Sequence, residues 1–265
     1  MIKQNMALRF VDDLAADDLQ YFSFEDALKR LNLTASATSN LLHRMVAHGL
    51  IDRIRRGRYA IRRFGVLGTR AASEDLATVV AAAFSGHQHR IAYRTALDEH
   101  DLLTHPVQTI YVATRKRMRV RSLSGRALCT IAEPEEALGI GSLAHGLSWI
   151  SDLERTLLDV AARPLLCGGA TILAGAVVAA GKRVDPDRLA RYAKQLGWSA
   201  ALRRIGSVSE ALVVNGLAGR LAPLKPPVAD LFLSPGAGQP TAWRDARWRV
   251  RWTETPEEIA NTVRQ

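Results

Sequence analysis

The sequence is poor in cysteine, in acidic residues relative to basic ones, and in long apolar runs. Its 265 residues include two cysteines, Cys129 and Cys167, which lie far apart within apolar stretches. So few cysteines exclude the disulfide framework of small secreted proteins. Two buried free thiols in a reducing compartment are the simplest expectation, and a single disulfide stays open as the alternative.

The chain also lacks a recognisable secretion signal and a membrane span. No apolar core precedes Asp12-Asp13, so we expect a cytoplasmic protein. Residues 165–181 carry no charge, but this stretch is seventeen residues long and is interrupted by four glycines. A bilayer helix needs about 20 apolar residues. We therefore expect a buried helix here and no membrane partner.

Sequence motifs for catalysis are missing as well. The chain has no Gly-x-Ser-x-Gly elbow and no local signature for a Cys-His pair. The nearest candidates for metal ligands are His87 and His89, His100 and His105, Asp98-Glu99, and Glu133-Pro134-Glu135-Glu136. The histidines lack zinc-site spacing, and the acidic groups are more simply exposed loop or helix-start residues. We expect no catalytic activity, metal or cofactor.

The positive charge, in contrast, is large. Lys and Arg number 36 against 26 Asp and Glu, which gives a formal net charge of +10 and a pI near 10.2. This balance favours a polyanionic partner. With 48% hydrophobic and 23% charged residues, the composition is that of an ordinary folded protein of two or three small domains.

Two amphipathic segments with a tight turn between them stand near the start of the chain. Ser23 and Asp26 are spaced as a capping box, and the apolar residues that follow recur at i, i+3, i+4 and i+7. Residues 32–35 break this period, and a second helix is expected over Ser36–His48, ended by Gly49. With a first helix over Met6–Ala15, this pattern predicts a helix-turn-helix module.

The second of these helices has separate core and outer faces. At about 100° per residue, its inner side carries Ala37, Thr38, Leu41, Leu42 and Met45. Its outer side is small, polar and singly basic: Ser36, Ser39, Asn40, His43 and Arg44. Such a face fits a major groove, where Asn suits adenine and Arg suits guanine or phosphate. We predict that these five outer residues contact DNA.

After Gly49 the pattern changes from helical to alternating. Residues 51–55 and 58–62 predict a hairpin that turns at Arg56-Gly57 and packs Tyr59 and Ile61 inward. Its arginines are expected to project outward or to stand at the tip: Arg53, Arg55, Arg56, Arg58 and Arg62. Arginines on a wing contact phosphates or enter a minor groove. A solvated strand edge is the alternative; the preceding helix-turn-helix favours a DNA-binding wing.

The pattern of the remaining chain predicts helices beside an antiparallel sheet. For the protein as a whole we therefore expect an α+β fold. We expect a winged helix-turn-helix domain over 1–68, which ends in a connector at Gly65–Gly68. An α+β domain should follow over 69–265, and a subdivision of it near 165–185 is an alternative. The expected helices are Ser73–Phe84, Ala92–Glu99, Ser151–Ala162, Ile172–Ala180, Pro186–Leu196 and Ala200–Val213. The expected strands are Gln108–Thr114, one near Met118–Leu123, Ala127–Ala132 and Ala246–Thr253.

Residues 150–159 form a compact motif, Ile-Ser-Asp-Leu-Glu-Arg-Thr-Leu-Leu-Asp. Ser151 and Glu154 predict a second capping box. Arg155 and Asp159 lie four residues apart and can form an ion pair on one helix face. Nothing in this arrangement requires catalysis. We interpret the motif as a structural anchor, with a partner-contacting site as the alternative.

Four segments, taken in order, resemble the AbiE-type antitoxins of type IV toxin–antitoxin systems. They are the wing ending Arg56-Gly57-Arg58-Tyr59, Tyr93–Leu97 with Leu102-Leu103-Thr104 and Pro106, Thr109–Thr114 running into Arg115-Lys116-Arg117, and Ile150–Asp159 followed by Pro164 and Gly168-Gly169. The order and spacing of these segments over residues 40–180 carry the resemblance. Residues beyond 215 resemble the family only loosely.

The resemblance implies a division of labour. The winged helix would bind inverted repeats in the promoter of its own operon and repress it. The remainder would counter a cognate nucleotidyltransferase-like toxin, and a stable complex with that toxin is not required. The expected partners are therefore double-stranded operator DNA and, functionally, the toxin.

A basic segment follows the third motif. Residues 115–126 carry six positive charges and no negative one. Five of these residues make a candidate second basic surface: Arg115, Lys116, Arg117, Arg119 and Arg121. Either this segment contacts nucleic acid or an acidic partner, or it is a solvated hairpin. The sequence leaves both interpretations open.

Three functions follow from these observations. The first is an antitoxin that is also an autorepressor. The second is a stand-alone winged-helix regulator whose C-terminal part senses a ligand or dimerises. The third, from another class, is a DNA-processing enzyme that a winged helix targets to DNA. The resemblance favours the first.

Overall fold

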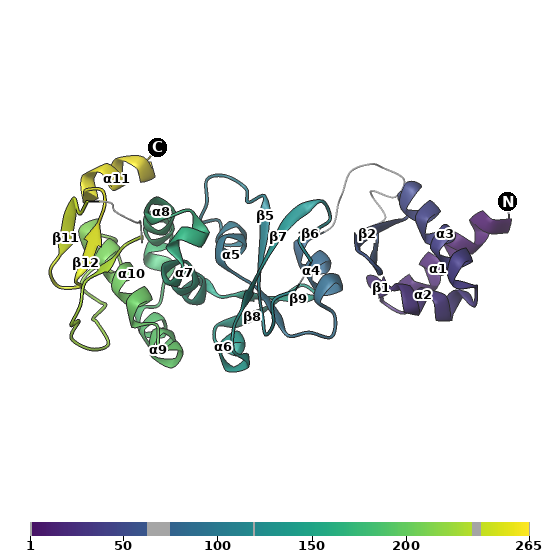
Figure 1. The fold of residues 1–265 in the computed structure, drawn as a ribbon, viewed down its shortest axis with the longest axis horizontal. Helices are drawn as coiled ribbons and strands as arrows, with labels where there is room; N and C mark the ends of the chain where they lie inside the picture. Colours follow the sequence, from purple (N-terminus) through teal and green to yellow (C-terminus); the bar gives the residue numbers. More distant parts are fainter. Residues whose placement is uncertain (1, 63–74, 119, 235–239, 265) are drawn as a thin grey trace.

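A computed structural model describes residues 2–62, 75–118, 120–234 and 240–264 (Figure 1). The described chain is elongated, with the N-terminal helices at one end, a six-stranded sheet in the middle, and the C-terminal helices and a small sheet at the other end. The predicted connector at residues 65–68 lies outside the described residues.

The N-terminal module is a winged helix-turn-helix. Its elements are α1 (Ile2–Ala16), β1 (Tyr21–Ser23), α2 (Phe24–Leu31), α3 (Ala35–Ala47), β2 (Ile51–Arg55) and β3 (Arg58–Ile61). The three strands form an antiparallel sheet in the order β1-β3-β2. Strand β1 was not predicted, because a three-residue strand joined directly to a helix leaves no alternating pattern to read.

Local capping signals position the two helices of the motif. The Ser23 and Asp26 capping box is present: Asp26 N donates to Ser23 Oγ at 3.0 Å, and Ser23 N donates to Asp26 Oδ2 at 2.8 Å. Asn32 ends α2 in the left-handed region, with φ of 49°. Helix α3 then begins at Ala35, one residue earlier than predicted, and Thr34 caps it by accepting a hydrogen bond from Ala37 N.

One face of the wing sheet closes the core of the module. Phe22 of β1 stacks on Tyr59 of β3 with ring centroids 5.5 Å apart, and Phe10 of α1 meets Phe22 edge-on at 5.2 Å. Leu42 and Met45 of α3 are fully buried in the same core. This core is what fixes α3 against the sheet and leaves its other side to solvent.

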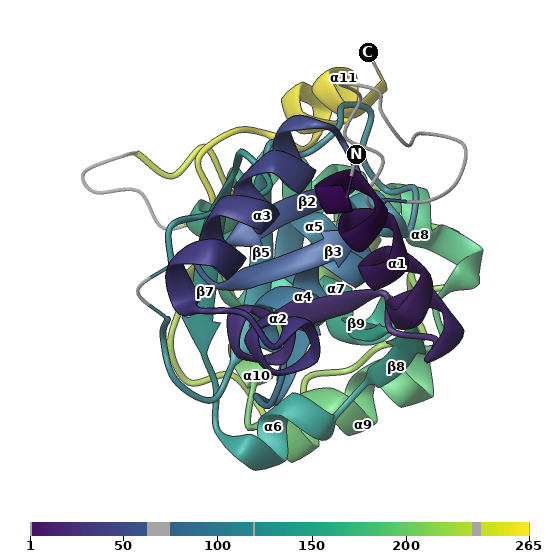
Figure 2. The same cartoon turned by 90° about the vertical axis from the view of Figure 1, so that its right-hand side faces the viewer.

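The other face of the wing sheet packs on the rest of the protein. Ile54 and Ala60 are buried against α4 (Leu76–Phe84), whose Val79, Val80 and Ala83 belong to the same hydrophobic cluster. Figure 2 looks along the long axis and shows the wing sheet in front of α4. The winged helix is therefore joined to the central sheet by a hydrophobic contact.

The central sheet has six strands in the order β6-β7-β5-β4-β9-β8. Their bounds are β4 (His89–Ile91), β5 (Thr109–Thr114), β6 (Ser122–Leu123), β7 (Arg126–Ala132), β8 (Ser142–His145) and β9 (Ser148–Ser151). The prediction of an antiparallel sheet is wrong in part, because β5 pairs with β7 and β4 with β9 in parallel. Pairings between distant segments decide strand direction, and no local pattern encodes them.

Helices cover both faces of this sheet. On one face α4 packs on Ile110, Val112 and Ile150; on the other, α5 (Tyr93–Glu99) and α7 (Leu153–Ala162) pack with Ala113 and Ile131. A short helix, α6 (Glu135–Gly139), follows β7. The sheet is thus the middle layer between the wing on one side and the C-terminal helices on the other (Figure 1).

The C-terminal region extends the hydrophobic core that α5 and α7 form with Ala113 and Ile131. It contains η1 (Pro164–Cys167), α8 (Ala170–Ala180), η2 (Gly181–Arg183), α9 (Pro186–Leu196), α10 (Ser199–Ala211), β10 (Leu231–Phe232), β11 (Trp243–Asp245), β12 (Val250–Trp252) and α11 (Pro256–Arg264). The uncharged stretch 165–181 contains most of η1 and all of α8, and one side of α8 is buried in this core. Among the described helices, none has both the length and the apolar character to cross a bilayer.

The predicted strand Ala246–Thr253 is shorter than expected. Only Val250–Trp252 is a strand, since the chain turns between β11 and β12 and Arg249 has a positive φ of 50°. The alternation nevertheless indicated burial correctly: Trp248, Val250 and Trp252 are fully buried, whereas Arg247 and Arg251 are exposed. Both tryptophans therefore belong to the core.

The two cysteines are free thiols, Cys129 partly and Cys167 fully buried. This agrees with the simpler of the two expectations. Burial raises the pKa of the Cys167 thiol to about 12, so it stays protonated at neutral pH.

Candidate nucleic-acid interface

The outer face of α3 is arranged as predicted. All five predicted DNA-contacting residues on it are exposed: Ser36, Ser39, Asn40, His43 and Arg44. Thr38, assigned to the core face despite its polar side chain, is fully buried, and its Oγ1 has no hydrogen-bond partner among the described residues. The helix therefore presents short polar side chains and one guanidinium to solvent.

A hollow of about 650 Å³ lies beside this face, between α1, the turn and α3. Asn40, His43 and Arg44 line its polar side, and Met6 and Leu33 line its apolar side. Three of the five predicted contact residues therefore converge on one concave surface. A base edge or a phosphate placed there would meet an amide, an imidazole and a guanidinium together.

The arginine side chains of the wing differ in their exposure to solvent and in their hydrogen-bond partners. Arg53 and Arg56 are exposed, and Arg58 is half-buried. For Arg55 and Arg62 the prediction that they project outward is wrong. Arg55 Nε donates to the Ala83 carbonyl at 3.0 Å, and Arg62 forms a bidentate ion pair with Asp52 at 2.6 and 2.7 Å.

A break in strand register explains the orientation of Arg55. The pairing of β2 with β3 shifts between Arg53 and Arg55, as at a β-bulge, and bulges re-aim side chains. Burial, together with the neighbouring Arg58 charge, lowers the pKa of the Arg55 guanidinium. Arg55 therefore joins the wing to α4 through this hydrogen bond.

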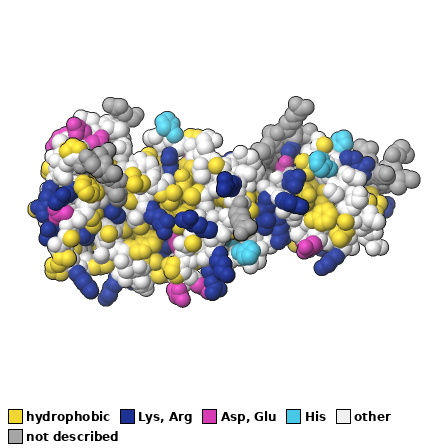
Figure 3. Space-filling view, viewed as in Figure 1, with side chains coloured by type: hydrophobic (Ala, Val, Ile, Leu, Met, Phe, Trp, Pro, Cys, Tyr) yellow, Lys and Arg dark blue, Asp and Glu magenta, His cyan; other side chains and the backbone are white. Residues whose placement is uncertain are grey.

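Of the five residues of the candidate second basic surface, the four that the structure describes are exposed. Arg115, Lys116 and Arg117 are exposed and line a hollow next to the loop after α4, and Arg121 is exposed before β6. Arg119 lies outside the described residues. Figure 3 shows Lys and Arg side chains on all three parts of one face of the molecule, with fewer Asp and Glu among them.

The motif at residues 150–159 is a structural centre. The predicted ion pair is present, with Arg155 Nε 2.7 Å from Asp159 Oδ1 and both side chains fully buried. The predicted capping box is wrong, because Asp152 caps α7 by accepting from Arg155 N at 2.8 Å. Ser151 Oγ instead donates to Asp159 Oδ2 at 2.9 Å, and Glu154 Oε1 accepts from Asp185 N at 2.8 Å.

Three residues that sequence reasoning missed complete this buried network. Arg90 on β4 approaches Glu133 at 3.1 Å and Asp159 at 3.4 Å. Arg155 also binds Glu133, at 2.8 Å, and the Tyr93 hydroxyl donates to Glu133. Two cations and two anions therefore balance inside the protein, which is the condition for burying charges without a large penalty.

Glu133 was expected to be an exposed loop acid, and that expectation is wrong. Its side chain is buried, and desolvation with the nearby Asp159 charge raises the pKa of its carboxyl group. The sequence signal that could have found it is the position directly after the long strand β7, in a sheet where β4, on the far side of β5, carries Arg90. That signal requires knowledge of the sheet order.

The other polar candidates have ordinary hydrogen bonds. His89 Nε2 lies 2.9 Å from Ser148 Oγ, and its Nδ1 lies 2.9 Å from the His87 carbonyl. Across the described ranges, no three His, Cys, Asp or Glu side chains are grouped to hold a metal ion.

Two comparisons with known proteins bear on the N-terminal module and on the fold. Residues 9–62 match the family described as "Transcriptional regulator, AbiEi antitoxin". The RV2827C protein from Mycobacterium tuberculosis, known from a crystal structure, is similar over 98% of this chain and 95% of its own, with a TM-score of 0.70 and 16% sequence identity. At this identity the likeness concerns the fold alone. No curated protein matches the sequence.

The family match covers α1 from residue 9, the helix-turn-helix and the wing, which is the same segment that carries the exposed polar face and the available arginines. It agrees with the resemblance inferred from the sequence motifs. Over residues 9–62, then, the chain is similar to the AbiEi antitoxin family of transcriptional regulators.

Proposed function

We propose that this protein binds promoter DNA of its own operon as a repressor and counteracts a nucleotidyltransferase-like toxin encoded beside it. The observation that supports the DNA-binding half best is the exposed polar face of α3 beside Arg53 and Arg56, within the segment that matches the AbiEi family. The antitoxin half rests on that family and on the motifs at residues 93–117 and 150–169.

In this proposal α3 enters the major groove. Asn40 and Arg44 would hydrogen-bond base edges, with Ser36, Ser39 and His43 at the rim. Arg53, Arg56 and Arg58 would contact phosphates, so affinity should fall steeply with salt. Arg55 and Arg62 have a different role: they hold the wing in place and do not contact DNA.

A mobility-shift experiment with the DNA upstream of the operon tests the interface. We expect Arg44→Ala and the double variant Arg53→Ala/Arg56→Ala each to weaken binding by at least about tenfold, because each removes charged contacts to DNA. The control is Arg191→Ala/Lys194→Ala on α9, which removes two exposed cations far along the chain from the wing. Equal loss in the control would indicate non-specific attraction and contradict the assigned interface.

The antitoxin half needs a test that does not depend on repression. Full-length chains should be expressed from an unrelated promoter together with the neighbouring toxin. We expect the wild type and the triple variant Arg44→Ala/Arg53→Ala/Arg56→Ala to restore growth alike, since the three side chains belong to the DNA face. If the wild type gives no rescue, the antitoxin half of the proposal is wrong.

A second candidate function is a stand-alone regulator with a sensing domain. The hollow lined by Arg115–Arg117 is the observation that favours it. The genes next to this one distinguish the two candidates, because a neighbouring nucleotidyltransferase gene is required only by the first.

A further inference from the structure

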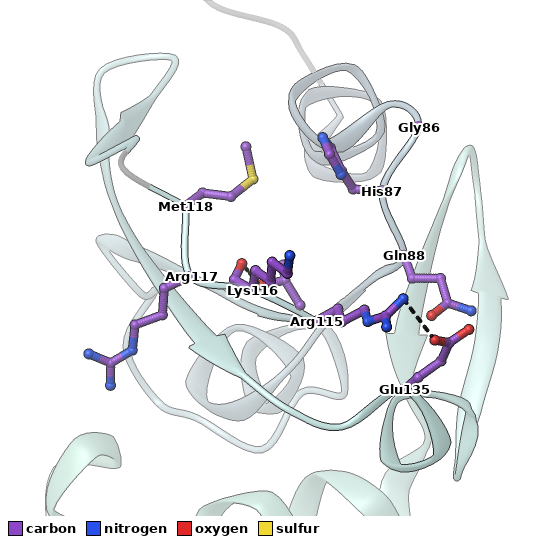
Figure 4. A pocket seen from close by; sticks show the side chains of 9 residues that line it. Gly86, His87, Gln88, Arg115, Lys116, Arg117, Met118 and Glu135 are labelled. Atoms are coloured by element: carbon purple, nitrogen blue, oxygen red, sulfur yellow. Dashed lines mark hydrogen bonds and ion pairs between the residues drawn. The ribbon is translucent and has the colours of Figure 1, made fainter.

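A hollow of about 730 Å³ opens between the end of α4, the loop after β5 and the start of α6 (Figure 4). Pockets for small molecules typically measure about 300–1,000 Å³. The lining residues come from three segments: Gly86, His87 and Gln88; Thr114 to Met118; and Glu135. The DNA-contacting face of α3 contributes none of them.

Hydrogen bonds hold the cationic loop in shape. Thr114 Oγ1 donates to the Lys116 carbonyl at 2.8 Å, and Met118 N donates to Thr130 Oγ1 at 3.2 Å. The Thr114 carbonyl accepts from Glu133 N at 2.9 Å. A loop tied at both ends loses less conformational freedom when a ligand binds, which favours binding.

The charge of the hollow is positive. Its lining includes three cations, Arg115, Lys116 and Arg117, and a single acid, Glu135, which pairs with Arg115 at 3.1 Å. Both side chains of that pair are more than half exposed, at 67% and 51%. Exposed pairs of this kind are weak, so the Arg115 guanidinium can turn toward an anion while Glu135 returns to solvent.

Two further side chains suit a flat ring. In Figure 4, Met118 and His87 stand on opposite sides of the hollow, and Lys116 lies between them. An imidazole can stack on a nucleobase, and a thioether makes favourable contacts with an aromatic ring. Phosphate contacts from Arg115 and Lys116 and a ring between His87 and Met118 together match the parts of a nucleotide.

We propose that this hollow binds a free nucleotide, its phosphates against Arg115 and Lys116 and its base between His87 and Met118. A surface that binds a DNA duplex needs cations that project outward. Here Lys116 lies within the hollow, and of the three lining cations only Arg117 points away from it (Figure 4), which favours a small ligand over a duplex. The site is distinct from the operator contacts of α3 and does not depend on the function proposed above.

Isothermal titration of the full-length protein with ADP, in the absence of DNA, tests the proposal. ADP should bind, and adenosine and inorganic phosphate should each bind at least about tenfold more weakly, because each lacks one half of the contacts. Arg115→Ala/Lys116→Ala should weaken ADP binding at least about tenfold, as loss of two charged hydrogen bonds implies. The matched control, Arg191→Ala/Lys194→Ala, removes the same charge elsewhere and should bind like the wild type.

Glu135→Gln should strengthen ADP binding, in contrast to the arginine and lysine substitutions. It removes the one negative charge of the hollow and frees Arg115, so ADP should bind severalfold more tightly. Four results would overturn the proposal: no ADP binding, equal binding of phosphate and ADP, equal loss in the control variant, or weaker binding in Glu135→Gln. Circular dichroism of each variant confirms that it is folded before it is compared.

Discussion

Neighbouring arginines on the wing have different physical roles. Arg55 is half-buried and donates to the Ala83 carbonyl, whereas Arg56, the next residue, is exposed at the turn. Both carry the same charge, and alternation alone cannot separate them. The difference arises from the shifted register of β2 and from the helix that packs on the wing.

Substitutions at these two positions should therefore differ in stability. Arg55→Ala should lower the free energy of unfolding by ~1 kcal/mol, because it removes a hydrogen bond to a carbonyl at a packed contact. Arg56→Ala should change it by less than ~0.5 kcal/mol, as for an exposed surface residue. Urea unfolding of both variants measures this, and equal stabilities would show that the Arg55 contact contributes nothing.

Burial likewise decides how much an ion pair contributes to the free energy of unfolding. Asp159 contacts Arg155 and Arg90 with no exposure to solvent, whereas Asp17 pairs with Arg30 at the surface. Asp159→Ala leaves buried guanidinium charge uncompensated and should cost about 3–5 kcal/mol. Asp17→Ala should cost at most ~1 kcal/mol. Chemical denaturation distinguishes the two, and similar losses would contradict a structural role for the buried network.

At the scale of single elements, the helix-turn-helix depends on the capping box of α2. The Ser23 hydroxyl bond, with the backbone bond from Ser23 N and the Arg58 and Lys29 charges, lowers the pKa of Asp26. A carboxyl group with a lowered folded-state pKa contributes stability above its unfolded pKa and loses it as the pH falls through the folded value.

The stability that Asp26 contributes should accordingly depend on pH. Asp26→Asn should be less stable than the wild type at pH 6. The difference should shrink as the pH falls below about 4, where the unfolded chain takes up the proton first and the folded carboxyl group does so at a lower pH. Ser23→Ala should cost ~1 kcal/mol as a lost N-cap. Thermal unfolding from pH 7 to pH 2.5 measures both effects, and a difference that stays constant with pH would exclude the charge of Asp26 as its cause.

Elements differ in how far the sequence predicts them. Helices with a full apolar period were placed almost to the residue, as at Pro186–Leu196, because capping and periodicity are local. Short strands such as His89–Ile91 and Ser142–His145 were missed, since three or four residues give no period and their partners lie far along the chain. The α3 face followed from helical geometry; the availability of Arg55 and Arg62 and the burial of Glu133 required tertiary contacts.

At the scale of the whole molecule, the contact between the wing and α4 is the main structural link between the winged helix-turn-helix module and the central sheet. Ile54 is 2% exposed and Ala60 fully buried at this contact. Ser124 N, at the turn between β6 and β7, also donates to the Ile54 carbonyl. A change in the central sheet can therefore reach the wing through packed atoms, and the stability of the wing should depend on residues outside the winged helix.

Truncating Ile54 tests this dependence against a matched core residue. Ile54→Ala and Leu42→Ala each remove a buried aliphatic side chain and should each cost about 2–5 kcal/mol. Hydrogen exchange should then separate them. Ile54→Ala should speed exchange in both the wing and α4, because its cavity lies between them, whereas Leu42→Ala should speed it in α1, α3 and the wing, where that cluster is confined. If α4 keeps wild-type protection in Ile54→Ala, the wing and the central sheet are stabilised independently, and coupling between DNA and the rest of the protein would need another route.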